Sequence, residues 1–180
     1  MKPNSSLRYF FAVMAMSALV VAAYSQQPEA PKAVAPVSGA LPVVAPAPVW
    51  TLKDVHGKSV NSAQFKGKVV VVDFWATWCG PCRSEIPGYI ELQNKYGKDG
   101  FVVVGISLDQ AGPKVVEDFV KKFGMNYQVV MGDDSIQEAF GGMDAIPTTF
   151  LIDRDGRIRD RKVGAESKDE YEKKVASLLK

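Results

Sequence analysis

The sequence predicts an α/β fold, because segments typical of strands alternate with segments typical of helices. An apolar run, Val69 to Trp75, is typical of a buried strand. The segment after it has the period of a helix with one apolar face, formed by Ile86, Ile90, Leu92 and Tyr96. The only two cysteines of the chain, Cys79 and Cys82, lie between this strand and this helix. We therefore expect a central mixed β-sheet flanked by helices, with a site where the first buried strand meets its helix.

The remaining elements follow in a regular order. A hairpin is expected first, from Trp50–Leu52 to Ser59–Val60, and the lone histidine, His56, falls in its turn rather than at a catalytic position. The elements after the cysteines are a strand at Phe101–Ser107, a helix near Lys114–Phe123, a strand at Tyr127–Met131, a short helix near Ile136–Phe140, strands at Thr148–Ile152 and Arg157–Val163, and a closing helix from Lys168.

The N-terminal segment has the layout of a secretory signal peptide, which we place at residues 1–25. Lys2 and Arg8 precede an apolar stretch from Tyr9 to Ala23, and Ala23-Tyr24-Ser25 is a small-x-small cleavage pattern. The stretch is shorter than the roughly 20 apolar residues that span a bilayer comfortably, which favours cleavage over an uncleaved membrane anchor. No cysteine follows the segment, so it is not a lipoprotein signal. We expect a periplasmic or otherwise extracytoplasmic protein, tethered to the inner membrane only if the segment is retained.

Residues 26–48 are rich in Pro, Ala and Val and are expected to be a disordered linker. Residues 49–180 then have the size of one globular domain, which we expect to be a monomer. The chain has 22 Lys and Arg against 20 Asp and Glu, and two of the basic residues lie in the predicted signal. Residues 26–180 therefore have no formal net charge, and this gives no indication of a nucleic-acid partner.

The spacing of the two cysteines favours redox chemistry. A structural disulfide is usually argued from a long closed loop, and this pair would close only a few residues. A zinc site needs about two further ligands, and the chain has no other cysteine and one histidine. We therefore expect no metal and no cofactor, because a dithiol carries both electrons itself.

Each cysteine has its own expected role. Cys79 lies at the helix N-terminus, where free N–H groups and the helix dipole stabilise a thiolate and lower its pKa below about 8.5. Cys79 is therefore the expected nucleophile, and Cys82 is placed to resolve a mixed disulfide. Pro81 fits the first turn of a helix, where its missing N–H costs nothing.

Two segments resemble the thioredoxin fold, and most closely the extracytoplasmic TlpA/ResA-type thiol-disulfide oxidoreductases. They are Phe74-Trp75-Ala76-Thr77-Trp78-Cys79-Gly80-Pro81-Cys82-Arg83-Ser84-Glu85-Ile86-Pro87 and Ile146-Pro147-Thr148-Thr149-Phe150-Leu151-Ile152-Asp153. The resemblance runs from about Trp50 to the C-terminus. It implies that Gly112 to Met131 is a helix and strand inserted into the thioredoxin core.

The resemblance also implies site residues and partners. It assigns Pro147 a cis peptide bond facing the cysteines and gives Ile146 and Pro147 a role in binding an extended substrate. Trp78, Gly80 and Pro81 complete the expected substrate-binding surface, since aromatic residues are common interface anchors. The Gly80-Pro81 pair matches thioredoxin and favours the reducing direction. The implied electron donor is a membrane-embedded thiol reductase, and the implied substrates are disulfides of apocytochrome c or other exported proteins.

Asp73 is the third candidate catalytic residue. If this carboxylate is buried within its apolar strand, its pKa rises and it could exchange a proton with Cys82. The residues alone equally allow an exposed Asp73 that pairs with Lys68. The resemblance favours the buried acid, because thioredoxin has it in its Asp-Phe-Trp-Ala segment, although many TlpA/ResA relatives carry Asn there.

Three alternative functions stay open at this point. A disulfide-introducing oxidase uses the same chemistry in reverse. A peroxiredoxin-like peroxidase would share the inserted segment but would be expected to carry a Thr-x-x-Cys site. Copper binding would use the cysteines as soft ligands, but it lacks a nearby His or Met motif.

Overall fold

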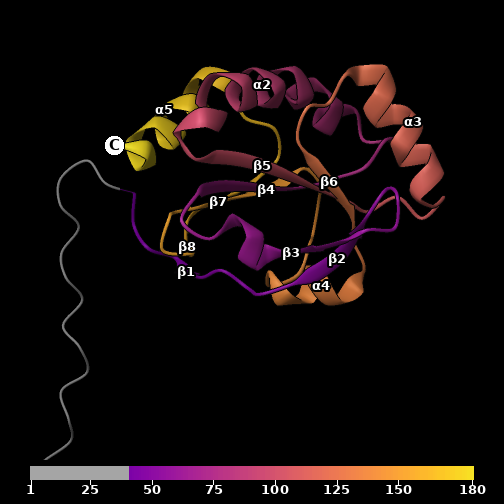
Figure 1. The fold of residues 1–180 in the computed structure, drawn as a ribbon, viewed down its shortest axis with the longest axis horizontal. Helices are drawn as coiled ribbons and strands as arrows, with labels where there is room; N and C mark the ends of the chain where they lie inside the picture. Colours follow the sequence, from indigo (N-terminus) through magenta and orange to yellow (C-terminus); the bar gives the residue numbers. More distant parts are fainter. Residues whose placement is uncertain (1–40) are drawn as a thin grey trace, which may run out of the picture. The chain divides into compact units, whose positions relative to one another are not determined.

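The computed structural model describes residues 41–180, which form a sheet with helices on both faces (Figure 1). The predicted signal peptide and residues 26–40 of the predicted linker lie outside the described residues. The elements are β1 (Ala45–Pro46), β2 (Thr51–Asp54), β3 (Ser59–Asn61), η1 (Ser62–Phe65), β4 (Val69–Trp75), α2 (Gly80–Tyr96), η2 (Gly97–Asp99), β5 (Phe101–Ser107), α3 (Pro113–Phe123), β6 (Gln128–Met131), α4 (Asp134–Ala139), β7 (Thr148–Ile152), β8 (Arg157–Val163) and α5 (Lys168–Leu179).

The described strands form one eight-stranded sheet in the order β1-β8-β7-β4-β5-β6-β2-β3. The β4–β5 and β5–β6 pairs are parallel, and the other neighbouring pairs are antiparallel. This mixed sheet is the one that the sequence predicts. β4 and β5 lie near its centre, and both are apolar and buried, as strands covered on both faces must be.

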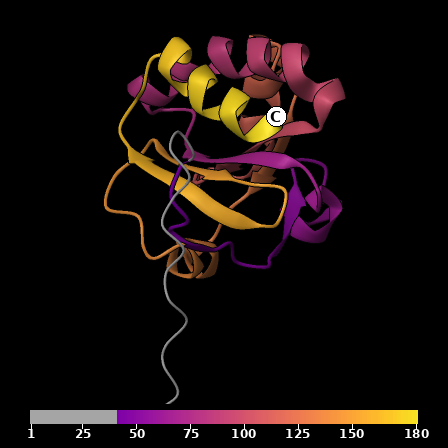
Figure 2. The same ribbon diagram turned by 90° about the vertical axis from the view of Figure 1, so that its left-hand side faces the viewer.

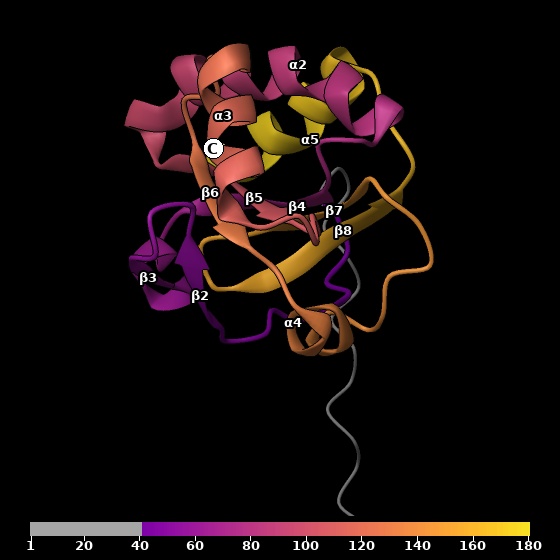
Figure 3. The same ribbon diagram turned by 90° about the vertical axis from the view of Figure 1, so that its right-hand side faces the viewer.

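The strand β4 supplies side chains to both faces of the sheet in strict alternation. Its even-numbered apolar residues, Val70, Val72 and Phe74, pack into the core on the side of α4. Val69 and Val71 pack on the opposite side, under α2 and α5, and Trp75 packs there with the cysteines and α3. Figures 1, 2 and 3 show this division, with α2, α3 and α5 on one face. By the same alternation, Asp73 faces α2.

The predicted elements are present, with one boundary corrected. Residues 41–48 belong to the domain rather than to a disordered linker, because β1 pairs with β8 and Val44 N–H donates to the Ile158 carbonyl at 2.7 Å. The composition was misleading here because an edge strand tolerates proline, whose missing N–H is not needed on its outer side. The domain therefore begins by Leu41 instead of Val49.

The described helices are all too short or too polar to cross a membrane.

Candidate active site

The two cysteines form a disulfide at the amino end of α2. Cys79 is the N-cap residue of this helix, and its Cα lies 5.3 Å from that of Cys82. The Cys82 N–H donates a hydrogen bond to Cys79 Sγ at 3.2 Å. In the reduced protein, this N–H and the positive end of the helix dipole favour a thiolate on Cys79. The geometry therefore has the asymmetry that the sequence predicts for a nucleophile and a resolving thiol.

A loop that precedes β7 covers the disulfide. The Ile146–Pro147 peptide bond in this loop is cis, as the resemblance implied. Cys79 Sγ lies 3.7 Å from the Ile146 carbonyl oxygen, so the loop directly contacts the sulfur expected to react. Pro147 is buried and Ile146 is half-buried. An extended peptide that reaches Cys79 would therefore meet the backbone of Ile146.

The side chains around the disulfide differ sharply in exposure. Trp78 is 69% exposed, whereas Trp75 is 1% exposed and packs in the core with the cysteines. Gly80 and Pro81 are also exposed. The structure thus gives the disulfide an accessible apolar border at Trp78, while Trp75 has only a packing role.

Asp73 is buried on the side of β4 that faces α2. Only 3% of its surface is exposed, and its Oδ1 atom has no hydrogen-bond partner within residues 41–180. Burial raises the pKa of this carboxyl well above its ordinary value, and the negative charge of Glu85 raises it further. Asp73 therefore occupies the buried position that the resemblance favoured, and the alternative pairing with Lys68 is not formed.

Glu85 is a site residue that the sequence reasoning missed. It follows Cys82 by three residues on α2, so both lie on one side of the helix. Its Oε1 atom accepts a hydrogen bond from the Glu166 N–H at 2.9 Å, and its buried Oε2 atom has no partner in the described part of the chain. Burial raises the pKa of Glu85 as well. The spacing from Cys82 was the available signal, but nothing in the sequence showed that this surface of the helix is covered by residue 166.

A small cavity adjoins Glu85. Its volume is about 170 Å³, and its lining includes Glu85, Tyr89 and Tyr171. The hydroxyl of Tyr171 is buried without a partner among residues 41–180, and burial raises the pKa of both phenols. A cavity of this size with polar groups in its lining has room for water, the usual partner of buried polar atoms that the protein leaves unsatisfied.

Asp109, just beyond the end of β5, holds the loop that leads into Cys79. Its carboxylate accepts hydrogen bonds from the Thr77 N–H at 2.9 Å, from the Thr77 hydroxyl, and from the Ser107 hydroxyl at 2.8 Å. The residue is 8% exposed. Because Thr77 precedes Cys79 by two residues, these bonds fix the backbone that presents the nucleophile. No motif indicated this contact in advance, since Thr77 and Asp109 are 32 positions apart in the chain.

The position of this disulfide suits it to thiol-disulfide exchange. A dithiol at a helix N-terminus can exchange with a disulfide presented along the Ile146 backbone. Two acids with raised pKa values lie nearby in the fold, Asp73 on the α2 side of β4 and Glu85 on α2. The fold and the site together define a thiol-disulfide oxidoreductase of the thioredoxin-like fold.

Comparison with known proteins identifies the family. A family model described as Redoxin matches residues 42–179. The thiol-disulfide oxidoreductase ResA of Bacillus thuringiensis is 34% identical over 128 residues, which are 70% of this chain and 72% of the relative. ResA of Geobacillus thermodenitrificans is 33% identical over 141 residues, or 77% and 79% of the two chains. The crystal structure of a thiol:disulfide interchange protein from Chlorobium tepidum covers 76% of this chain and 97% of its own, with 38% identity and a TM-score of 0.70.

The chain therefore belongs to the Redoxin family, among the ResA-type thiol-disulfide oxidoreductases. Membership of this family implies protein substrates.

Proposed function

We propose that the protein is an exported reductant that opens disulfides in other extracytoplasmic proteins, including apocytochrome c. The observation that carries this proposal is the Cys79–Cys82 disulfide at the amino end of α2, in contact with the Ile146–Pro147 loop. The Gly80-Pro81 pair between the cysteines supports the reducing direction by its match to thioredoxin. The predicted signal peptide supports export.

The proposed cycle starts from the reduced protein. The Cys79 thiolate attacks one sulfur of a substrate disulfide, which forms a mixed disulfide and releases the other substrate sulfur as a thiolate that takes up a proton. Cys82 then loses its proton and attacks Cys79 Sγ, which breaks the mixed disulfide. The products are the reduced substrate dithiol and the Cys79–Cys82 disulfide, so two electrons pass to the substrate, and its two thiols balance the proton released by Cys82 and one proton from solvent.

The buried acids would serve the second of these steps. Cys82 is 1% exposed, so its proton has no direct route to bulk solvent. In the proposal, the Asp73 carboxylate takes this proton, and Glu85 and water in the adjoining cavity pass it on. The raised pKa of Asp73 suits this task, because it makes the carboxylate a stronger base toward the Cys82 proton than an exposed carboxylate would be.

The cycle closes when a donor reduces the Cys79–Cys82 disulfide again. A membrane-embedded thiol reductase fits this role, because an oxidising compartment offers no soluble pool of electrons. Trp78, Gly80, Pro81 and Ile146 would form the surface that both the donor and the substrate contact, and the buried Pro147 would hold the Ile146 backbone in place. The protein would act as a monomer that needs no cofactor.

Trapping experiments with single cysteine variants test the roles of the two thiols. A model peptide with one disulfide is mixed with Cys82→Ser and with Cys79→Ser, and the products are separated without reductant. We expect the first variant to accumulate a mixed disulfide on Cys79 and the second to form almost none. Accumulation on Cys82 in the second variant would reverse the assignment.

The direction and location are tested in cells that export the protein. Acid quenching followed by thiol alkylation reports the redox state, and mass spectrometry of the N-terminus reports cleavage after Ser25. We expect both thiols to be free in most of the protein and the first 25 residues to be absent. A predominantly oxidised pair would instead indicate a disulfide-introducing oxidase.

A further inference from the structure

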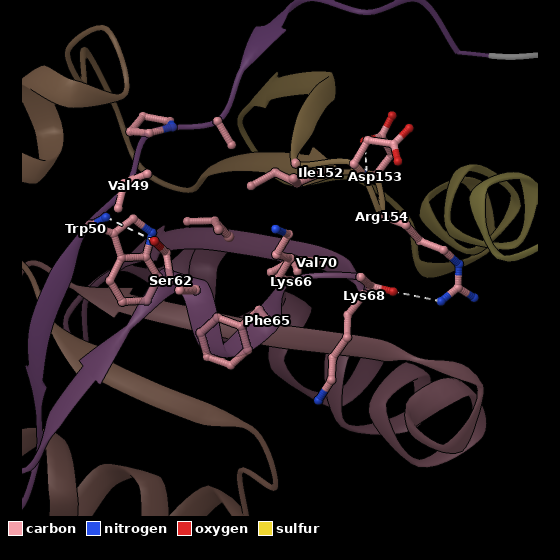
Figure 4. Close-up of a pocket in the computed structure, with 17 residues that line it drawn as sticks. Val49, Trp50, Ser62, Phe65, Lys66, Lys68, Val70, Ile152, Asp153 and Arg154 are labelled. Carbon is pink, nitrogen blue, oxygen red and sulfur yellow. Dashed lines mark hydrogen bonds between the residues drawn. The ribbon is translucent and has the colours of Figure 1, made fainter.

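A larger cavity lies on the opposite face of the sheet, at the amino end of β4 (Figure 4). Its volume is about 510 Å³, which is within the range of about 300–1,000 Å³ of small-molecule sites. Its floor consists of Val70 and Val72 from β4 and Ile152 from β7. Strands rise about 3.3 Å per residue, so Val70 lies roughly 16 Å from the end of β4 that leads to the disulfide. The cavity is therefore separate from the redox site.

The cavity exists because this part of the sheet has no long helix over it. Long helices cover the other face, whereas here the cover is the four-residue η1 and the segment that leads into β2. Trp50 and Phe65 form one wall, with ring centroids 6.1 Å apart. This wall is apolar, as in most small-molecule binding sites.

The rim of the cavity carries an exposed apolar side chain. Val49 lines the cavity and is 84% exposed. A single exposed valine is common on protein surfaces, but at this position it extends the apolar lining that a ligand would contact.

The charges around the cavity leave an excess of cations. The two carboxylates that line it are both engaged by arginines, since Asp153 pairs with Arg157 and Arg159 and Asp155 pairs with Arg157.

The lining cations have no such partners. Arg154 donates only to the backbone carbonyls of Gly67 and Asp99. Lys66 and Lys68 form no ion pair with any described carboxylate, and Figure 4 shows Lys66 between Trp50 and Arg154.

We propose that this cavity binds a single-chain anionic amphiphile, meaning an alkyl chain that ends in a carboxylate. The chain would lie along Val70, Val72 and Ile152 and displace water from apolar walls. The carboxylate would pair with the Lys66 ammonium in a charge-assisted bond. We expect the occupant to be both apolar and anionic, because an uncharged chain would gain nothing from the exposed Lys66 ammonium and a small inorganic anion would leave the apolar walls wet.

Calorimetric titration of the purified protein with dodecanoate, below its micelle concentration, tests the proposal. We expect one molecule to bind per chain. Decanoate and octanoate should bind more weakly in turn, by up to roughly fourfold per methylene removed. Dodecanol should bind up to about fivefold more weakly than dodecanoate, because it has the chain without the charge.

Three variants locate the site. Lys66→Ala should weaken dodecanoate binding by up to about fivefold, because Lys66 is exposed, and Ala63→Trp, at an exposed lining position, should weaken it further by filling the cavity. Lys173→Ala is the matched control, since Lys173 is exposed on α5, across the sheet. All three variants should keep the disulfide-exchange rate of the parent protein.

Several results would overturn the proposal. These are equal binding of dodecanol and dodecanoate, no effect of Lys66→Ala, or amide NMR shifts on dodecanoate addition that avoid η1 and β4. Binding to phosphatidylglycerol vesicles that depends on Lys66, without binding of free dodecanoate, would instead make this face a membrane-docking surface.

Discussion

Two buried aspartates near the disulfide have opposite surroundings. Asp73 on β4 and Asp109 after β5 lie toward the same edge of the sheet, because the two strands are parallel. Asp109 has three hydrogen-bond donors on its carboxylate, whereas Asp73 leaves Oδ1 without a partner in the described structure. A saturated carboxylate holds a geometry, and an unsatisfied one can gain or lose a proton at low structural cost. The same side chain thus does positioning work in one place and is suited to proton transfer in the other.

The largest expected effect is on stability, from Asp109→Ala. This change leaves the Thr77 N–H and the Ser107 hydroxyl without an acceptor, at about 1–3 kcal/mol for each buried group. We expect the free energy of unfolding to fall by about 3 kcal/mol in urea titration. Thr77→Val, which removes one hydroxyl bond, should cost about 1 kcal/mol. A loss below about 1 kcal/mol for Asp109→Ala would show that Asp109 does not hold the loop.

The next largest expected effect is on the rate of disulfide exchange, from Asp73→Asn. Removing the proposed acceptor of the Cys82 proton should slow resolution of the mixed disulfide by about a hundredfold. The change should also flatten the pH dependence of that step, because Asn does not titrate. Stopped-flow measurement of single-turnover exchange across pH 5–9 gives both quantities, and an unchanged profile would remove Asp73 from the mechanism.

Asp73→Asn should also change stability, in the direction opposite to Asp109→Ala. The folded pKa of Asp73 is raised, so its neutral form is favoured by folding and stability falls as the pH rises from the unfolded pKa, about 3.9, through the folded value. The Asn variant lacks this penalty. It should therefore be more stable than the parent by about 2 kcal/mol at pH 8, with a gain that disappears near pH 4. A gain that does not depend on pH would contradict this account.

The smallest expected effect is a shift in a pH profile, from Glu85→Gln. The glutamine keeps an oxygen for the Glu166 N–H but removes the negative charge that raises the pKa of Asp73. The midpoint of the resolution profile should move to lower pH, and the plateau rate should fall only severalfold, because water in the cavity can still carry the proton without Glu85. Glu91→Gln, on a more exposed part of α2, is the matched control and should leave the midpoint in place. Equal shifts in both variants would indicate a general effect of charge on the helix.

The sequence predicted the parts of this site that depend on neighbouring residues. The apolar run of β4, the position of Cys79 before α2 and the hairpin around His56 all follow from local pattern. The resemblance added the cis bond at Pro147 and favoured the buried form of Asp73, which residue types alone left undecided.

Long-range contacts could not be predicted in this way. Glu85 receives its hydrogen bond from residue 166, and Asp109 holds Thr77 across 32 positions. The strand β1 was not predicted, because its segment is rich in proline and such a composition is typical of a linker. The cavity at Val70 forms because no long helix covers this part of the sheet. That absence depends on how all the elements pack together, so it cannot be predicted from one segment of the sequence.

The most direct test of the proposed function is the reduction potential of the Cys79–Cys82 couple, measured on the purified protein by equilibration against defined thiol buffers. A reductant should have a potential near that of thioredoxin, about −270 mV, or below. A reduction potential of about −120 mV, typical of a strong disulfide-introducing oxidase, would contradict the proposed direction.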